Sequence, residues 1–349
     1  MKVVIDDKIP YIDAAARSLF DRVAYLPGAA FAGSDELSDA DALIVRTRTL
    51  CNRALLQDTA VRFVATATIG FDHINANELA LMGVGWTNCP GCNAASVGQY
   101  VRNSLLLVAR SRGVDVSCFK VGIVGYGHVG RAVCEALHEV GCELMVNDPP
   151  LALSGGCDVV FSGLDELAAE CDVITFHTPL TTVGPFATYH LADKNFFSQL
   201  GRKPVIINAA RGGVVDEEAL LCAHESGVVR EMVVDTWENE PHINLALLNK
   251  AFIATPHIAG YSADGKSNAT RMALRAVCKY FDIEIEDEER FLTMTAPPRL
   301  SADCVETGDR DEDFLRLYNP FADTVALRAE PSAFERLRGN YPLRREHFA

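Results

Sequence analysis

The stretch Val121-Gly-Ile-Val-Gly125-Tyr-Gly127-His-Val-Gly130 joins a short apolar run to three glycines spaced as Gly-x-Gly-x-x-Gly. The apolar run predicts a buried strand, and a helical pattern continues from the third glycine to about Val140. The first glycine permits a tight turn, the second lets backbone amides approach a pyrophosphate, and the third lets helix and strand pack closely. This order of strand, glycines and helix predicts a Rossmann domain, a doubly wound α/β fold that binds a dinucleotide at the turn.

An acidic residue, Asp148, ends the next predicted strand. A carboxylate at this position accepts hydrogen bonds from ribose hydroxyls and repels a 2′-phosphate, so the sequence predicts NAD rather than NADP. Methyltransferases also combine a glycine-rich first turn with a second-strand acid, and they remain an alternative at this point. The predicted cofactor contacts in this region are Gly125, Gly127, His128, Val129, Gly130 and Asp148.

Outward from this turn, apolar runs alternate with helical patterns. The strands expected in the second half are Val121–Gly125, Glu143–Val146, Val173–Phe176, Val205–Asn208, Met232–Val234 and Phe252–Ala254. The first hundred residues show the same alternation, with strands expected at Lys2–Asp6, Ala42–Arg46 and Phe63–Thr66 and helices at Tyr11–Phe20, Asn52–Gln57 and Ile74–Met82. Alternation of this kind predicts parallel sheets covered by helices on their faces.

The sequence therefore predicts an α/β protein with two doubly wound parallel-sheet domains. Residues 1–95 and 263–290 form a discontinuous substrate-binding domain, in which the helix Ser267–Phe281 packs back beside the first strands. Residues 96–262 form the NAD-binding domain, which includes most of a long linker helix over Ala94–Arg112. Residues 291–349 are too poor in apolar side chains for a core of their own, so we expect them to dock on the main body or on a second subunit.

Composition excludes several classes of function. The chain has 349 residues and a formal charge of −15, which disfavours nucleic acid and anionic membranes as partners. It contains no apolar run of about 18 residues, and acids stand where a signal peptide needs an apolar core, so we expect a cytoplasmic protein. The 11 cysteines are scattered. The single pair Cys89-Pro-Gly-Cys92 lacks a second pair, so no metal site is predicted.

Three residues with complementary chemistry follow successive predicted strands. Arg211, Glu240 and His257 each lie in a loop of the second domain. A neutral imidazole beside a carboxylate accepts a proton near neutral pH, and a guanidinium holds an anionic substrate. Each residue alone would be an ordinary loop residue. Together, after a dinucleotide fold, they have the parts needed to oxidise a hydroxy acid.

The stretches Thr66-Ala-Thr-Ile-Gly70-Phe-Asp72-His73 and Thr255-Pro-His257-Ile-Ala-Gly260-Tyr261 resemble the D-isomer-specific 2-hydroxyacid dehydrogenase family, and the resemblance covers roughly residues 1–290. It implies that Arg211 holds the substrate carboxylate and that His257 takes the hydroxyl proton. Glu240 would orient His257 and favour its protonated form. The resemblance also implies cofactor contacts by Thr178, Asp235 and Gly260, and substrate contacts by Thr47, Thr68 and Tyr261.

The tail Leu337-Arg-Gly-Asn-Tyr341-Pro-Leu-Arg-Arg345 resembles one branch of the family that acts on a small phosphorylated hydroxy acid. This resemblance implies a C-terminal dimerisation domain over residues 291–349 and a homodimer. Guanidinium groups suit a phosphate, so we expect Arg46 and Arg48 to bind it. A further hypothesis is that Arg344 and Arg345 reach the site from the partner subunit. A sister dehydrogenase acting on phosphoglycerate or glyoxylate, and an NAD-sensing corepressor, remain alternatives.

Overall fold

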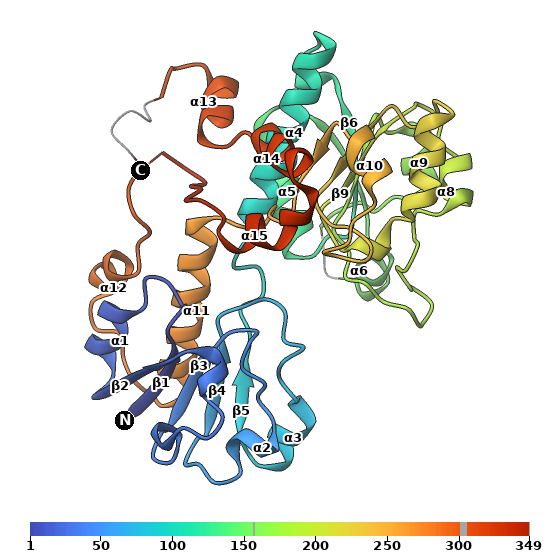
Figure 1. Cartoon of the computed structure of the whole chain (residues 1–349). Coiled ribbons are helices and arrows are strands. Elements are labelled where there is room, and N and C mark those ends of the chain that lie inside the picture. The colour runs from blue at the N-terminus through green and yellow to red at the C-terminus, as the bar shows by residue number, and fades with distance from the viewer. Residues whose placement is uncertain (156–157, 301–305, 349) are drawn as a thin grey trace. The chain divides into compact units, whose positions relative to one another are not determined.

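The computed structural model describes residues 1–155, 158–300 and 306–348 and divides the chain into two compact units. Unit 1 consists of Met1–Asn93 and Ser262–Arg299, and unit 2 of Ala94–Tyr261 and Leu300–Ala349. Each unit contains one parallel sheet with helices on both faces (Figure 1). The predicted fold class, two parallel-sheet α/β domains, is confirmed, and the C-terminal segment is helical.

Unit 1 contains a five-stranded sheet with the order β2-β1-β3-β4-β5. Its strands are β1 (Lys2–Asp6), β2 (Arg22–Leu26), β3 (Ala42–Val45), β4 (Phe63–Thr66) and β5 (Gly85–Thr87). One face packs against α1 (Asp13–Leu19), α11 (Ala263–Tyr280) and α12 (Glu288–Met294), and the other against α2 (Arg53–Leu56) and α3 (Ala76–Leu81). The strand order reverses between β1 and β3, where an open parallel sheet places its ligands.

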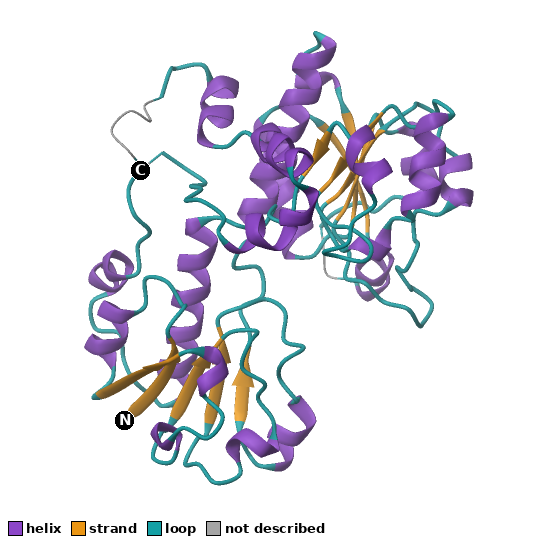
Figure 2. Ribbon diagram, in the orientation of Figure 1, coloured by secondary structure: helices purple, strands orange, loops and turns teal. Residues whose placement is uncertain are grey.

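Unit 2 contains a six-stranded parallel sheet with the order β11-β10-β9-β8-β6-β7. Figure 2 shows its strands in orange among the helices of the unit. Its strands are β6 (Lys120–Val124), β7 (Glu143–Asn147), β8 (Val173–Phe176), β9 (Val205–Asn208), β10 (Glu231–Val234) and β11 (Ile253–Ala254). One face packs against α4 (Ala94–Arg112) and α5 (His128–Glu139), and the other against α7 (Leu164–Glu170), α8 (Lys194–Ser198), α9 (Glu217–Glu225) and α10 (Leu245–Lys250). The short α6 (Pro149–Ser154) follows β7. In this sheet the direction in which successive strands are added reverses between β6 and β8.

The dimerisation domain predicted for residues 291–349 stays a prediction, and within the single chain this segment is divided between the two units. Residues up to Arg299 belong to unit 1, and the rest belongs to unit 2. Its helices are α13 (Arg310–Leu317), α14 (Pro320–Ala329) and α15 (Phe334–Gly339). These helices are too short to form a hydrophobic core of their own. Leu327 and Phe334 are therefore buried in one apolar cluster of unit 2, and Leu315 is buried in the other.

The sequence predicted each of the other strands to within one residue but missed β2, β5 and α14. β2 lies at the edge of its sheet, and β5 has only three residues, so neither has a long apolar run. α14 did have a recognisable start signal. The Asn319 side chain accepts a hydrogen bond from the Phe321 N–H, and Pro320 stands in the first turn. In the described ranges, no helix is both long enough and apolar enough to cross a membrane.

Candidate active site

The glycine turn of unit 2 is shaped by two packing constraints and one opening. Gly125 has a φ of +95°, and a Cβ there would lie 2.9 Å from the backbone carbonyl of His177. A Cβ on Gly130 would lie 2.0 Å from the Gly125 oxygen. A Cβ on Gly127, the N-cap of α5, would meet nothing within 4 Å. The middle glycine thus leaves the helix N-terminus open to a ligand, and His128 and Val129 form the first turn beside it.

Polar groups gather around this turn at the ends of β7 and β8. The Tyr126 N–H donates to Asp148 Oδ2 at 2.8 Å, which places the acid beside the glycines. Among the described residues, His177 Nδ1 and Thr178 Oγ1 are buried without a hydrogen-bond partner. Burial lowers the pKa of His177 to about 3, so this imidazole is neutral. An open helix N-terminus, an acid and two unpaired polar atoms fit a dinucleotide.

His257 and Glu240 form a hydrogen-bonded dyad. The distances from His257 Nδ1 to Glu240 Oε2 and Oε1 are 2.8 and 3.0 Å. The Trp237 N–H donates to Glu240 Oε1 at 2.9 Å and fixes the carboxylate. Burial alone would raise the pKa of Glu240, but His257, Trp237 and Arg338 together hold that pKa below its usual value. Glu240 is therefore a carboxylate near neutral pH, as an orienting partner for an imidazole requires.

Asp235 holds the loop that carries His257. Its Oδ1 accepts from the Ile258 N–H at 2.7 Å and its Oδ2 from the Ala259 N–H at 3.0 Å. Only 1% of Asp235 is exposed, and burial raises its pKa. These bonds support His257 in a left-handed conformation with φ 56°. The structure thus gives Asp235 a positioning role, and its predicted contact with the cofactor, like that of Gly260, stays a prediction.

Arg211 follows β9 and is exposed in the same hollow as the dyad. Its Nη1 donates to the Ala210 carbonyl at 2.7 Å. A Cβ on Gly212 would lie 1.9 Å from the Trp237 carbonyl oxygen, so the Arg211 loop approaches the Glu240 loop because residue 212 is glycine. The hollow has a volume of about 380 Å³ and is lined by Arg211, Glu240 and His257. The three predicted catalytic residues therefore lie together within unit 2.

Several charged residues near this hollow were missed in the sequence. His190 Nε2 lies 2.9 Å from Glu238 Oε1, and the Glu238 N–H donates to Glu217 Oε1 at 2.7 Å. Burial raises the pKa of Glu217 to about 7, with a smaller contribution from the neighbouring acids and against the lowering effect of the Glu238 hydrogen bond. Arg338 of α15 lies 3.9 Å from Glu240 Oε2. No local motif identifies these contacts, because they join loops far apart in sequence.

Arg344, the first arginine of the tail pair, is bonded to other segments of unit 2. Arg344 Nε donates to Gln99 Oε1 at 2.8 Å, and its Nη2 donates to the Ser96 carbonyl at 2.6 Å. Its Nη1 donates to the carbonyls of Ile258 and Ala259, both at 3.2 Å. The hypothesis that Arg344 reaches a partner's site is therefore wrong, since all three donor nitrogens are engaged within its own unit. Arg345 is also buried, and its substrate contact stays a prediction.

The predicted substrate residues of unit 1 lie at the carboxyl ends of β3 and β4. Arg46 Nη1 donates to the Lys8 carbonyl at 3.1 Å, and Thr47 is exposed. Thr68 Oγ1 donates to the Gly70 carbonyl at 2.9 Å. Burial and the nearby Arg46 guanidinium lower the pKa of Lys266 on α11. Lys266 is a second cation beside Arg46 that the sequence did not indicate, and this pairing suits an anion.

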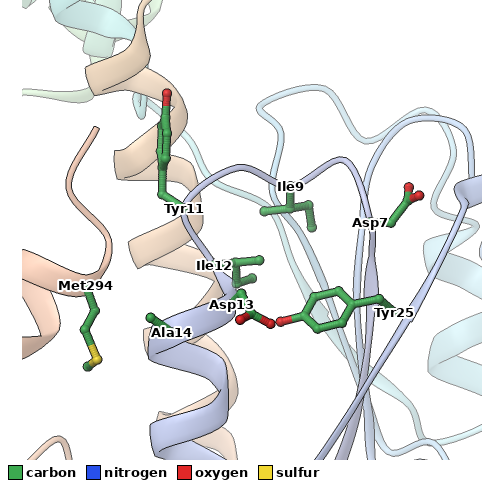
Figure 3. Close-up of a pocket in the computed structure, with 8 residues that line it drawn as sticks. All are labelled: Asp7, Ile9, Tyr11, Ile12, Asp13, Ala14, Tyr25 and Met294. Carbon is green, nitrogen blue, oxygen red and sulfur yellow. The ribbon is translucent and has the colours of Figure 1, made fainter. Parts of the chain in front are cut away.

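A second pocket, of about 450 Å³, lies in unit 1 between α1 and β2 (Figure 3). Its charged lining side chains are Asp7 and Asp13, and Figure 3 shows Asp13 directed toward the Tyr25 hydroxyl. Acidic walls repel an anionic substrate, so this pocket does not suit a hydroxy acid.

Cys89 is buried elsewhere in unit 1, and burial raises its thiol pKa to about 12, which makes it a packed thiol rather than a reactive one.

Known proteins identify the class to which this fold and site belong. A family model described as the NAD binding domain of D-isomer specific 2-hydroxyacid dehydrogenase matches residues 95–259. The chain belongs to the D-isomer-specific 2-hydroxyacid dehydrogenase family, as predicted. Over 349 residues it is 48% identical to the erythronate-4-phosphate dehydrogenase of Bacteroides thetaiotaomicron, a match that covers 100% of this chain and 98% of that relative.

Solved structures share the fold. A D-lactate dehydrogenase from Treponema pallidum is 21% identical with a TM-score of 0.64, and the match covers 82% of this chain and 98% of that one. A D-lactate dehydrogenase from Aquifex aeolicus, solved with NAD and lactic acid, is 22% identical with a TM-score of 0.57, covering 80% and 95%. With the NAD-binding family model, these results confirm the predicted cofactor, NAD. The chain is an NAD-dependent oxidoreductase.

Proposed function

We propose that this protein oxidises 4-phospho-D-erythronate to (R)-3-hydroxy-2-oxo-4-phosphobutanoate with NAD, a step in pyridoxal 5′-phosphate biosynthesis. The substrate assignment is supported by the full-length similarity to an erythronate-4-phosphate dehydrogenase. The reaction type is supported by one observation above all: Arg211 and the His257–Glu240 dyad line one hollow in the unit that carries the dinucleotide turn.

The residues of the hollow divide the chemistry between them. Arg211 holds the C1 carboxylate and faces the C2 oxygen. His257 accepts the C2 hydroxyl proton on Nε2, because its Nδ1 is already bonded to Glu240. Glu240 stabilises the imidazolium that forms. Bound NAD supplies the acceptor for the hydride that leaves C2. Removal of the proton prevents charge from accumulating on carbon, and a positioned base contributes about 10²–10⁴-fold.

We propose that Gly127, Asp148 and Thr178 hold NAD, and that Arg46, Thr47 and Thr68 hold the phosphorylated substrate. Tyr261 is a further proposed substrate contact, as is Arg345. The open N-terminus of α5 supports the first assignment, and the Arg46–Lys266 pair supports the second.

We also propose a cytoplasmic homodimer. The exposed Phe321 and Val325 on α14 support an interface there, and sedimentation velocity tests the dimer.

The test of the function is incubation with 4-phospho-D-erythronate and NAD, monitored as NADH and as oxo acid. His257→Gln should lower kcat/KM about 10²–10⁴-fold while leaving NAD affinity unchanged. A panel with 3-phosphoglycerate, glycolate and D-lactate provides the comparison. A higher kcat/KM for one of these acids would reassign the substrate, and absence of turnover with every acid would overturn the proposal.

A further inference from the structure

Arg338 brings a positive charge from the C-terminal segment to the catalytic dyad. Its Nη1 lies 3.9 Å from Glu240 Oε2, and its guanidinium carbon lies 5.9 Å from the centre of the Tyr261 ring. Arg338 and Glu240 are 29% and 19% exposed, so water screens this pair only partly. A cation this close to Glu240 alters how strongly that carboxylate stabilises a protonated His257.

The bonding of Arg338 differs from that of neighbouring arginines. Arg344 has each of its donor nitrogens bonded to a carbonyl or an amide oxygen, so its role is structural. Arg336, on the same helix α15, pairs with Glu330 at the surface. Within the described ranges, Arg338 Nε is buried without a hydrogen-bond partner. Burial would lower the pKa of the Arg338 guanidinium, but Tyr261, through its charge and a side-chain hydrogen bond, and then Glu240 raise it. Arg338 therefore differs from the other two arginines in that one of its partners is the carboxylate of the dyad.

We propose that Arg338 is a positioning residue of the dehydrogenase site, which acts through Glu240 to keep His257 in its neutral, proton-accepting form. This inference rests on the proposed function in taking His257 as the base. Without Arg338, Glu240 would be less compensated and would favour the imidazolium. Since oxidation of a hydroxy acid requires the neutral imidazole, the arginine would extend activity to lower pH.

Other charged groups also face the dyad, and they fix the sign of the effect. Asp235 is bonded to the loop that follows His257, and its charge interacts with that of the imidazole. Glu217 lies close enough to Glu240 to be influenced by its charge. The remaining charged residues that line the hollow are Arg211 and Glu238. The acids favour the imidazolium, so Arg338, with Arg211, offsets them. Loss of one of two cations shifts proton uptake toward higher pH.

The experiment measures kcat/KM against pH for the full chain with NAD and 4-phospho-D-erythronate. In Arg338→Met, the acidic limb should move up by about 0.5–1 pH unit, as expected for the loss of one nearby charge in a partly screened site. Arg338→Gln is a second neutral variant. Arg338→Lys, which keeps the charge, should restore the limb to within about 0.2 unit. Arg336→Met removes an arginine from the same helix and should leave the limb unmoved.

A second readout does not depend on turnover. NMR of histidine-labelled protein without substrate follows proton uptake by the His257 imidazole, assigned with His257→Gln. The midpoint should move up in both neutral variants and stay in place in Arg338→Lys and Arg336→Met. An unmoved midpoint in folded Arg338→Met, or an equal shift in Arg338→Lys, would overturn the proposal. Failure of the wild type to oxidise the substrate would instead reject the proposed function, because the NMR titration still reports on Arg338.

Discussion

Glu217 shows how burial at a single residue makes stability depend on pH. The residue is 7% exposed, and burial raises its pKa from 4.5 to about 7; the hydrogen bond from the Glu238 N–H opposes this shift, and the acids around Glu217 add to it. Because the pKa of Glu217 is higher in the folded than in the unfolded protein, its protonation stabilises the fold. This contribution to the free energy of unfolding is fully present below about pH 4.5 and is lost as the pH rises through about 7. Above pH 7, the folded protein contains a poorly solvated carboxylate.

Glu217→Gln should therefore stabilise the protein at alkaline pH. We expect the free energy of unfolding to rise by about 1–3 kcal/mol at pH 8.5 and to change little at pH 5, because glutamine keeps an oxygen for the Glu238 N–H without the charge. Urea unfolding at the two pH values measures the difference. The matched control is Glu218→Gln, since Glu218 is the exposed neighbour on the same helix. An equal effect from both substitutions, or no dependence on pH, would contradict this account.

At the scale of elements, the β6–α5 turn separates a fold requirement from a ligand requirement. Gly130 is needed for packing, since a Cβ there would lie 2.0 Å from a backbone oxygen. Gly127 faces open space. Adjacent glycines of one motif therefore have different physical tasks, and substitutions should distinguish them.

Gly130→Ala should lower the free energy of unfolding by about 2 kcal/mol or more, because helix and strand must move apart. Gly127→Ala should cost less than about 1 kcal/mol in stability. It should nevertheless weaken NAD binding by about tenfold or more, because a methyl group separates phosphate from the helix amides. Chemical unfolding and calorimetric titration with NAD measure the two effects. If Gly127→Ala bound NAD as tightly as the wild type, the turn would not be the phosphate site.

At the scale of the whole molecule, the tail is part of the catalytic unit rather than an appendage. Arg344 joins the C-terminal segment to α4 through Ser96 and Gln99, and to the loop after His257 through two carbonyls. Its guanidinium carbon also lies 3.6 Å from the centre of the Tyr318 ring. The side chain of Arg344 thus holds together three segments that are distant in sequence.

Arg344→Met should lower the free energy of unfolding by about 2–5 kcal/mol, because buried oxygens lose their donors. Hydrogen exchange should show residues 258–261 and the tail losing protection together. Arg316→Met provides a control, since Arg316 is an exposed arginine whose acidic partner Glu312 lies 3.8 Å away on the same helix. Loss of protection in the tail alone would show that Arg344 does not support the catalytic loop.

The amino-acid sequence by itself determined the architecture and the central chemistry. Strand and helix periods are local, so alternating patterns revealed two parallel sheets. Parallel strands place their carboxyl ends at one edge, so Arg211, Glu240 and His257 were predicted as one group. Asp148 and the glycines were recognisable because their spacing is short.

Only the tertiary structure decided which distant side chains modify that chemistry. Arg338 lies almost a hundred residues from Glu240 in sequence, and Arg344 is bonded to carbonyls on two other segments. The raised pKa of Glu217 and the division of the tail between the two units also depend on packing. Burial and the distance between charges are properties of the folded chain. No sequence period encodes them, because they arise where separate elements meet.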